Sequence, residues 1–217
     1  MTILLLVRHG ENDYLQKGIL IGSRISTHLN EHGREQAEEL AKALKEYPIK
    51  AIYSSPLERA VETAEPIAST HHLQIQPCPG LMDLDVGIWA GRSYKLLNRI
   101  KAWKIVQRAP SLFHFPEGES FLQAQERVVS ELDAIIKAHP QAVVAVVFHA
   151  DPIKLAIAHY IGLSFDNFQR LGVGAASVSI LAVQEFGAAL LAMNLTPPFS
   201  LPFKKGDRHP KNAVRRK

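Results

Sequence analysis

The hydrophobic positions of this chain form short continuous runs that alternate with helical patterns. Residues 3–7 and 142–147 are apolar throughout, which is typical of strands buried on both faces of a sheet. Less regular runs predict further strands at residues 51–54, 73–77, 177–183 and 188–194.

Helical periodicity fills most of the segments between these strands. Asn30 can cap a helix that runs to about Tyr47, because apolar residues recur on one of its faces, and Ser120 can cap another. The predicted helices cover residues 31–47, 56–69 with Pro56 in the first turn, 96–107, 121–138, and 151 or 152 to 161, while 80–91 is predicted as a loop. Strands alternating with helices predict an α/β fold, a three-layer sandwich with a mainly parallel central sheet flanked by helices.

Length and charge indicate one domain followed by a basic tail. The 217 residues are 47% hydrophobic and 21% charged, and they contain no visible repeat or linker, so residues 1–203 are predicted as one domain. Residues 204–217 hold seven Lys or Arg and one acid, which leaves −2 on the rest of a chain of net charge +4. This segment is predicted to be disordered. A basic tail can bind nucleic acid weakly, but we favour a solvated tail and expect no nucleic-acid partner.

The chain shows no sign of export or membrane insertion. No apolar run is long enough to span a bilayer, and residues 3–7 are not followed by a cleavage site. Cys78 is the single cysteine, so no intramolecular disulfide can form. It has no neighbouring base, which favours a structural role over a nucleophilic one. These features predict a cytoplasmic protein with no membrane partner.

Residues able to bind an anion follow three of the predicted strands. Arg8 and His9 end the first strand, and His149 ends the apolar run that starts at residue 142. Arg59 lies in the helix that follows the strand ending at Ser55. Because the carboxyl ends of parallel strands meet at one edge, these side chains are expected to meet there. Guanidinium groups match phosphate oxygens, and helix N-termini add donors, so the pattern predicts a phosphate pocket.

Each of these residues also has an ordinary explanation. Arg59 could pair with Glu58 or Glu62 on a solvated helix face. His149 could be a hydrogen-bonded core histidine, and a His-Gly pair after a strand is often structural. Their joint placement favours the phosphate pocket.

Arg8-His9-Gly10-Glu11 after an apolar strand resembles the signature of the histidine phosphatase superfamily, in its phosphoglycerate-mutase-like branch. The resemblance continues in order to about Ser179, through residues 29–37, 54–64, 81–91, 116–120 with Arg127, and 147–151. It implies the phosphoglycerate mutase-like fold and makes residues 1–203 a single catalytic domain.

The resemblance also implies metal-independent phosphoryl transfer without a cofactor. His9 would be the nucleophile that forms a phosphohistidine, with its other ring nitrogen held by a backbone carbonyl near Gly10. The catalytic set implied is His9, Asp83, Arg8, Arg59 and His149, and substrate binding would fall to Arg8, Asn12, Arg59 and His149.

The general acid and base departs from the family pattern. The family usually has Glu where this chain has Asp83, which is one methylene shorter. Asp85 is the competing candidate two residues on, although the alignment favours Asp83. Either residue could instead be an ordinary solvated loop acid.

The segment after the signature departs as well. Many members have Thr, Asn and Arg where this chain has Asn12, Leu15 and Ile19. Asn12 can still donate to phosphate, whereas Leu15 and Ile19 give a more apolar entrance, to which Trp89 is expected to add. These changes disfavour a small polyanionic substrate such as phosphoglycerate, and they favour a hydrolase of small phosphomonoesters over a mutase.

Three other functions remain open from the sequence. The first is a phosphoglycerate-type phosphomutase, and the second is a phosphatase of protein phosphohistidine, disfavoured by the insert at residues 96–109. The third is a weakly active module that binds a phosphorylated ligand, which Asp83 in place of Glu keeps open. Residues 195–203 could pack over the body or form a homodimer contact.

A zinc-binding pattern is also present but is poorly placed. His28-Leu29-Asn30-Glu31-His32 fits His-x-x-Glu-His, which needs both histidines on one helical face. Because Asn30 is the expected helix cap, the helix would begin inside the motif, and no metal site is predicted.

Overall fold

The computed structural model describes residues 1–201, and its centre is a six-stranded sheet in the order β4-β3-β6-β1-β7-β8. Strands β4, β3, β6 and β1 run parallel, while β7 and β8 are antiparallel to their neighbours. The strands are β1 (Thr2–Arg8), β3 (Ile49–Ser54), β4 (Ile75–Pro77), β6 (Val143–Phe148), β7 (Val178–Gln184) and β8 (Gly187–Leu195). The mainly parallel sheet is therefore confirmed. The tail predicted at residues 204–217 lies outside the described residues.

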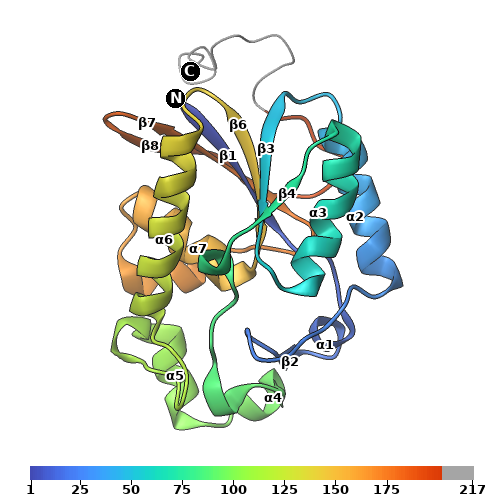
Figure 1. Cartoon of the computed structure of the whole chain (residues 1–217). Coiled ribbons are helices and arrows are strands. Elements are labelled where there is room, and N and C mark those ends of the chain that lie inside the picture. Colours follow the sequence, from blue (N-terminus) through green and yellow to red (C-terminus); the bar gives the residue numbers. More distant parts are fainter. Residues whose placement is uncertain (202–217) are drawn as a thin grey trace.

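Helices cover both faces of this sheet (Figure 1). Helices α2 (Glu31–Leu44) and α3 (Glu58–His71) pack on one face, and α6 (Phe121–Ala138) and α7 (Ala150–Tyr160) on the other. The sequence encodes the starts of two of these helices. Asn30 caps α2 by accepting from the Gly33 amide, and Ser120 caps α6 in a capping box with Gln123. The predicted three-layer sandwich is confirmed.

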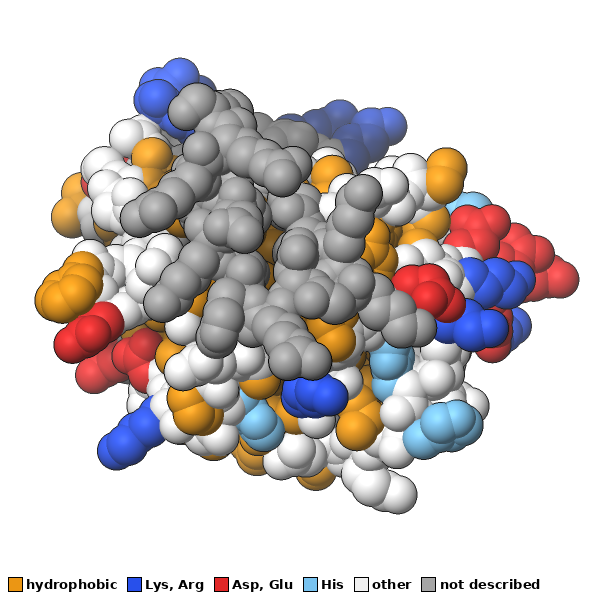
Figure 2. All heavy atoms as spheres, turned by 90° about the horizontal axis from the view of Figure 1, so that it is seen from above, with side chains coloured by type: hydrophobic (Ala, Val, Ile, Leu, Met, Phe, Trp, Pro, Cys, Tyr) orange, Lys and Arg blue, Asp and Glu red, His pale blue; other side chains and the backbone are white. Residues whose placement is uncertain are grey.

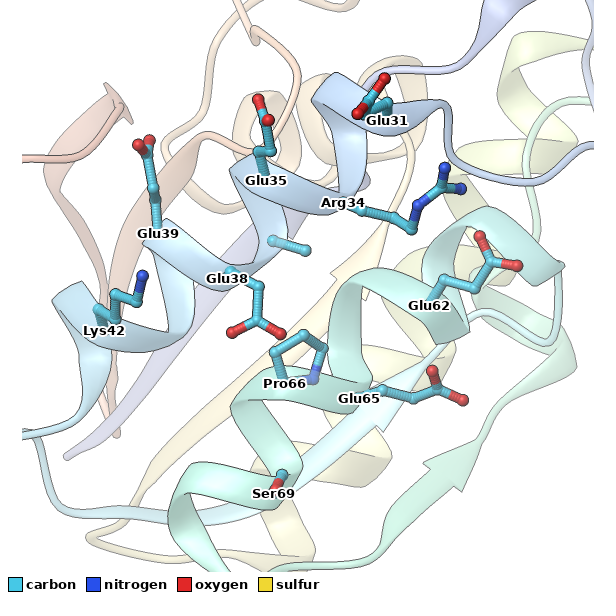
Figure 3. Close-up of a pocket in the computed structure, with 11 residues that line it drawn as sticks. Glu31, Arg34, Glu35, Glu38, Glu39, Lys42, Glu62, Glu65, Pro66 and Ser69 are labelled. Atoms are coloured by element: carbon cyan, nitrogen blue, oxygen red, sulfur yellow. The ribbon is translucent and has the colours of Figure 1, made fainter.

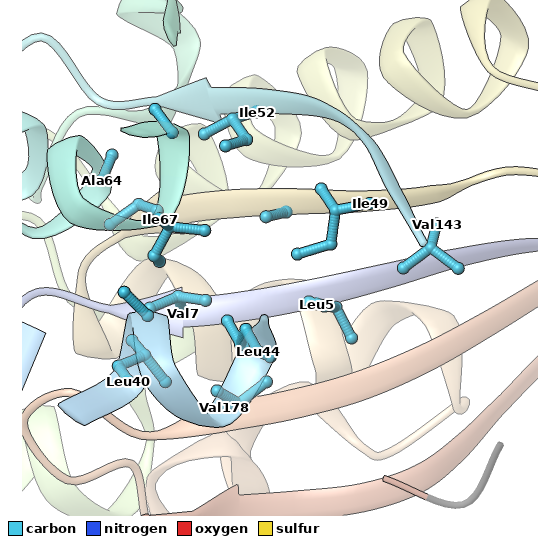
Figure 4. Close-up of a cluster of buried hydrophobic side chains, with 14 of the residues drawn as sticks. Leu5, Val7, Leu40, Leu44, Ile49, Ile52, Ala64, Ile67, Val143 and Val178 are labelled. Carbon is cyan, nitrogen blue, oxygen red and sulfur yellow. The ribbon is translucent and has the colours of Figure 1, made fainter. Parts of the chain in front are cut away.

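The alternating faces of β1 divide its side chains between two cores. Leu5 and Val7 pack with Leu40 and Leu44 of α2 on one side (Figure 4). Leu4 and Leu6 pack toward α6 and α7 on the other. Burial on both faces explains why this strand is apolar at every position, and it fixes the place where His9 leaves the sheet.

Short elements that the sequence did not predict surround the carboxyl ends of the parallel strands. The predicted helix at 96–107 is split into α4 (Tyr94–Leu97) and α5 (Lys101–Arg108). The others are α1 (Asp13–Gln16), β2 (Ile19–Leu20), β5 (Arg92–Ser93) and the 3-10 turns Pro79–Leu81, Gly87–Trp89, Pro110–Leu112 and Phe165–Arg170. Strands β2 and β5 pair in a separate two-stranded sheet, which ties the segment after His9 to the segment before α4.

The opposite end of the molecule, where the parallel strands begin, has a mixed surface. Acidic, basic and hydrophobic side chains are interspersed there among those coloured in Figure 2. Phe199 and Leu201 pack against the core beside α2, and the Leu201 amide donates to the Tyr47 hydroxyl at 2.8 Å. The described part of the 195–203 segment thus packs over the body. None of the helices within residues 1–201 has the length and apolar character needed to cross a bilayer.

Candidate active site

His9 directly follows β1 and is buried. Its Nδ1 atom lies 2.7 Å from the carbonyl oxygen of Gly10. Because a carbonyl oxygen can only accept, Nδ1 carries the proton and Nε2 keeps its lone pair. The predicted contact near Gly10 is confirmed, and the ring has the tautomer that a nucleophile requires.

Gly10 allows close packing directly behind this histidine. A Cβ atom at this position would lie 2.6 Å from the carbonyl oxygen of Gly33 in α2. The Gly10 amide donates to the Thr63 hydroxyl of α3 at 2.9 Å. The turn after β1 is thus held against both helices on that face of the sheet, which fixes the position of the imidazole.

The two predicted arginines flank His9, and each is anchored by backbone carbonyls. Arg59 of α3 is completely buried, and its Nη2 donates to the Gly22 carbonyl and to Asp83 Oδ2, both at 3.0 Å. Arg8 donates from Nη1 to the Val173 carbonyl at 2.7 Å. Arg59 therefore does not lie on a solvated helix face, and the alternative of a surface ion pair is wrong.

His149 lies at the N-cap of α7, and its ring centroid is 5.2 Å from that of His9. Its Nε2 atom lies 2.9 Å from the Ser55 hydroxyl oxygen, at the end of β3. Three parallel strand ends thus contribute to one cluster, as the sequence predicts.

Unpaired nitrogen atoms are concentrated in this cluster. Among the described residues, four buried side-chain nitrogens without a hydrogen-bond partner belong to residues selected from the sequence: Arg8 Nε, Asn12 Nδ2, Arg59 Nε and His149 Nδ1. A buried donor without a partner costs about 1–3 kcal/mol of folding free energy. Such groups therefore favour the binding of a ligand that supplies hydrogen-bond acceptors. Asn12 uses its Oδ1 to cap α1, which leaves its amide nitrogen free to donate.

Asp83 joins this cluster, and Asp85 does not. Asp83 Oδ2 binds Arg59 and lies 3.7 Å from His149 Nδ1, while Oδ1 accepts from the Leu84 amide. Asp85 is paired with Arg24 and accepts from the Gly87 amide, so both of its oxygens are used within the loop. Of the two candidates, the structure brings only Asp83 to the histidines.

Partly buried contacts of Arg127 and Glu119 fix the loop that carries Asp83. Arg127 of α6 donates to the carbonyls of Gly80 and Met82, at 2.8 and 3.0 Å, and to Glu119. Glu119 in turn accepts from the Asp85 amide. These contacts hold the loop from which the shorter acid reaches the pocket.

The cluster opens into a pocket of about 320 Å³ that Arg8, His9 and Asp83 line. Leu15 and Ile19 also line it, which confirms the apolar character expected after His9. The expectation that Trp89 contributes is wrong. Trp89 is only 4% exposed and packs against Phe113 and Phe115 in a separate aromatic core, because the 3-10 turn Gly87–Trp89 directs it inward.

Comparison with known proteins identifies the family to which the chain belongs. Residues 4–196 match the histidine phosphatase superfamily (branch 1). The chain belongs to the histidine phosphatase superfamily.

Relatives of this histidine phosphatase include both hydrolases and mutases. It is 30% identical over 201 residues to phosphoserine phosphatase 1 of Hydrogenobacter thermophilus, covering 90% of this chain and 93% of the relative. It is also 30% identical over 185 residues to the 2,3-bisphosphoglycerate-dependent phosphoglycerate mutase of Thermoplasma acidophilum, covering 85% of this chain and 88% of that protein. Among solved structures, Bacillus stearothermophilus YhfR has a TM-score of 0.82 at 27% identity, over 88% of this chain and 95% of its own. The chain is therefore an enzyme of the phosphatase and phosphomutase group, as expected.

The electrostatics of the pocket keep both histidines neutral. Burial, the neighbouring imidazole of His149 and the charges of Arg59 and Arg8 hold the pKa of His9 well below its ordinary value. Burial and the two arginines lower the pKa of His149 in the same way. A neutral His9 keeps the lone pair on Nε2 at neutral pH without first losing a proton.

These shifts make the stability of the phosphatase depend on pH. An unfolded histidine has a pKa near 6.5, above the folded value, so the unfolded chain binds more protons below that pH. The free energy of unfolding is therefore expected to fall as pH drops below about 6.5. For His9→Asn, the slope between about pH 6.5 and 5 should be smaller by up to about 1.4 kcal/mol per pH unit, measured by urea unfolding. Equal slopes in the two proteins would contradict a neutral, buried His9.

A larger hollow lies elsewhere and has different chemistry. A groove of about 990 Å³ runs between α2 and α3 (Figure 3). Six glutamates, including Glu38 and Glu65, line it with Arg34 and Lys42, and none of its lining residues is a histidine. It offers mostly acceptors, whereas a phosphate needs donors.

Two sequence-level alternatives find structural explanations. His28 pairs with Glu62 of α3, whereas His32 lies inside α2 beside Gln36, so the zinc-like pattern spans a helix start. Within residues 1–201, no three His, Cys, Asp or Glu side chains are grouped as metal ligands. Cys78 is buried, which raises the pKa of its thiol to about 12.

Sequence reasoning missed several residues of the pocket. Ser55 was seen only as part of a strand end, although its hydroxyl holds His149. Tyr94, Asp151 and Lys154 also line the pocket. Asp151 and Lys154 lie two and five residues after His149, at the start of the helix that follows β6, so their place near this strand end could have been inferred from the sequence.

Proposed function

We propose that the protein is a phosphomonoester hydrolase that acts through a phosphohistidine at His9 and needs no metal ion. The observation that carries this proposal is the set of unpaired buried nitrogens around a histidine whose Nε2 lone pair is free. Such a pocket provides a nucleophile together with donors for the charged phosphoryl oxygens.

In the first step, His9 Nε2 attacks phosphorus and the bond from phosphorus to the ester oxygen breaks. Arg8, Arg59 and His149 stabilise the charge that develops on the non-bridging oxygens, and the amide of Asn12 adds a donor. Two guanidinium groups beside a neutral imidazole can provide this stabilisation in a buried site, which supports a metal-independent reaction.

Asp83 is proposed to protonate the leaving oxygen and then to take a proton from water. Its Oδ2 accepts a hydrogen bond from Arg59. An arriving phosphate dianion competes for Arg59, which would leave Oδ2 of Asp83 available to carry the proton that the leaving oxygen takes. After the alcohol leaves, the carboxylate is the base that activates water to hydrolyse the phosphohistidine.

Hydrolysis is favoured over mutase activity by the walls of the pocket. A mutase must hold a second acidic group of its substrate. The two positions after His9 where many family members have Asn and Arg are apolar in this chain, namely Leu15 and Ile19, and both line the pocket. The relatives include a phosphoserine phosphatase and a phosphoglycerate mutase, so the product must be identified directly.

The test is phosphate release from phenyl phosphate with excess chelator, beside a product assay with 3-phosphoglycerate. We expect free phosphate that is insensitive to the chelator, and no isomerised ester. Loss of release with the chelator would contradict metal independence. An isomerised product formed faster than free phosphate would make the protein a mutase.

A further inference from the structure

A second chamber of about 230 Å³ adjoins the pocket at His9. The two share part of their lining, namely Leu20, Leu84, Val86, Tyr94, Asp151 and Lys154. The alcohol of a phosphate ester held at His9 would therefore lie close to this second chamber. The combined space is in the range of sites for small organic molecules, which are typically about 300–1,000 Å³.

Aromatic and aliphatic side chains form most of the second chamber's wall. Trp103 and Val106 come from α5, Phe115 comes from the segment before α6, and Phe121 is the first residue of α6. Tyr94 packs against Trp103, with ring centroids 5.8 Å apart. Such a wall favours a ligand with an apolar or flat body.

Asp151 and Lys154 are the charged residues that line the chamber, and they neutralise each other. Lys154 Nζ donates to Asp151 Oδ1 at 2.9 Å and to the side-chain carbonyl of Gln169 at 3.2 Å. The side chains of Lys154 and Asp151 are only 15% and 27% exposed. Two of the three N–H donors of the ammonium are therefore used and its charge is compensated by Asp151, so a carboxylate that enters the chamber would find no uncompensated cation among its lining residues.

We propose that the second chamber selects phosphomonoesters with an uncharged, partly apolar leaving group, and that Asp151 enforces this choice by neutralising Lys154. The proposal rests on the proposed hydrolase function. A substrate that carries a carboxylate beside the phosphate would need an unpaired cation near the phosphoryl group, which Lys154 does not provide because it is paired with Asp151.

A matched pair of substrates isolates the charge of the leaving group. Phosphate release is measured with 4-carbamoylphenyl phosphate and 4-carboxyphenyl phosphate, which have similar size and differ in charge. The wild type should have a kcat/KM about tenfold or more higher for the carbamoyl ester. Equal values, or a preference for the carboxyl ester, would overturn the inference while leaving the hydrolase function intact. Release from neither ester would overturn both.

Two substitutions should move this ratio in opposite directions. Asp151→Asn frees Lys154 to bind a carboxylate and should lower the preference for the carbamoyl ester about tenfold. Lys154→Gln leaves Asp151 as an uncompensated acid and should raise that preference. Glu39→Gln, on the exposed side of α2, is the matched control and should keep the wild-type ratio. A purely structural role for the ion pair predicts that both variants move the ratio the same way, which would contradict the proposal.

Discussion

His9→Ala is expected to lower kcat for phosphate release by roughly 10⁴-fold or more. The substitution removes Nε2, the atom that is proposed to bond to phosphorus. The contact of Nδ1 with the Gly10 carbonyl keeps the lone pair on this atom in the wild type. The arginines remain, so substrate binding should survive better than turnover. Steady-state kinetics with phenyl phosphate measure both quantities.

His159→Ala is the matched control for this variant. His159 is an exposed histidine near the end of α7, and it should be replaceable with little change in kcat. If His9→Ala keeps more than about one-hundredth of the wild-type kcat, a covalent role for His9 is untenable.

Asp83→Asn has the second largest expected effect, a loss of about 10²–10⁴-fold in kcat with an alkyl phosphate. An alkoxide is a poor leaving group and needs the proton that Asp83 supplies. With 4-nitrophenyl phosphate, whose leaving group needs little protonation, the first step should survive while hydrolysis of the phosphohistidine is slow. A burst of nitrophenol followed by slow turnover, seen by stopped flow, is therefore predicted.

The Asp85→Asn variant distinguishes loss of the general acid from damage to the loop that carries it. Asp85 binds Arg24 and the Gly87 amide, so its loss should weaken the loop without removing the proton donor. We expect a much smaller loss of kcat, of similar size for alkyl and nitrophenyl esters. A loss that depends on the leaving group in Asp85→Asn, and not in Asp83→Asn, would reassign the general acid.

The sequence predicts the central fold well because its physical signals are local there. Continuous apolar runs mark β1 and β6 since both strands are buried on both faces. Asn30 and Ser120 mark helix starts since capping is a contact between near neighbours. The gathering of His9 and His149 follows from parallel strands sharing one carboxyl edge.

The rim of the pocket could not be predicted because distant contacts shape it. Strands β2 and β5 are two residues each and exist only because they pair with each other. The break between α4 and α5 follows no Gly or Pro, and its residues turn to pack over the aromatic core. Trp89 was misplaced for the same reason, since nothing near it in sequence shows that it packs against Phe113 and Phe115.

The position of Asp83 depends on both a local sequence signal and a distant contact. Alignment to the family motif selects it over Asp85, but its position beside Arg59 depends on Arg127, more than forty residues later in the chain. Sequence spacing alone could not show that the shorter side chain reaches the pocket.

The most direct test of the central claim is to trap the phosphorylated enzyme. The protein is mixed rapidly with a ³²P-labelled phosphate ester, quenched in alkali, digested, and analysed for the labelled peptide. We predict a label that is stable in alkali, lost in acid, located on His9, and formed fast enough to account for turnover. A protein that releases phosphate at full rate while no label forms on His9, or while the label lies on another residue, would contradict the account.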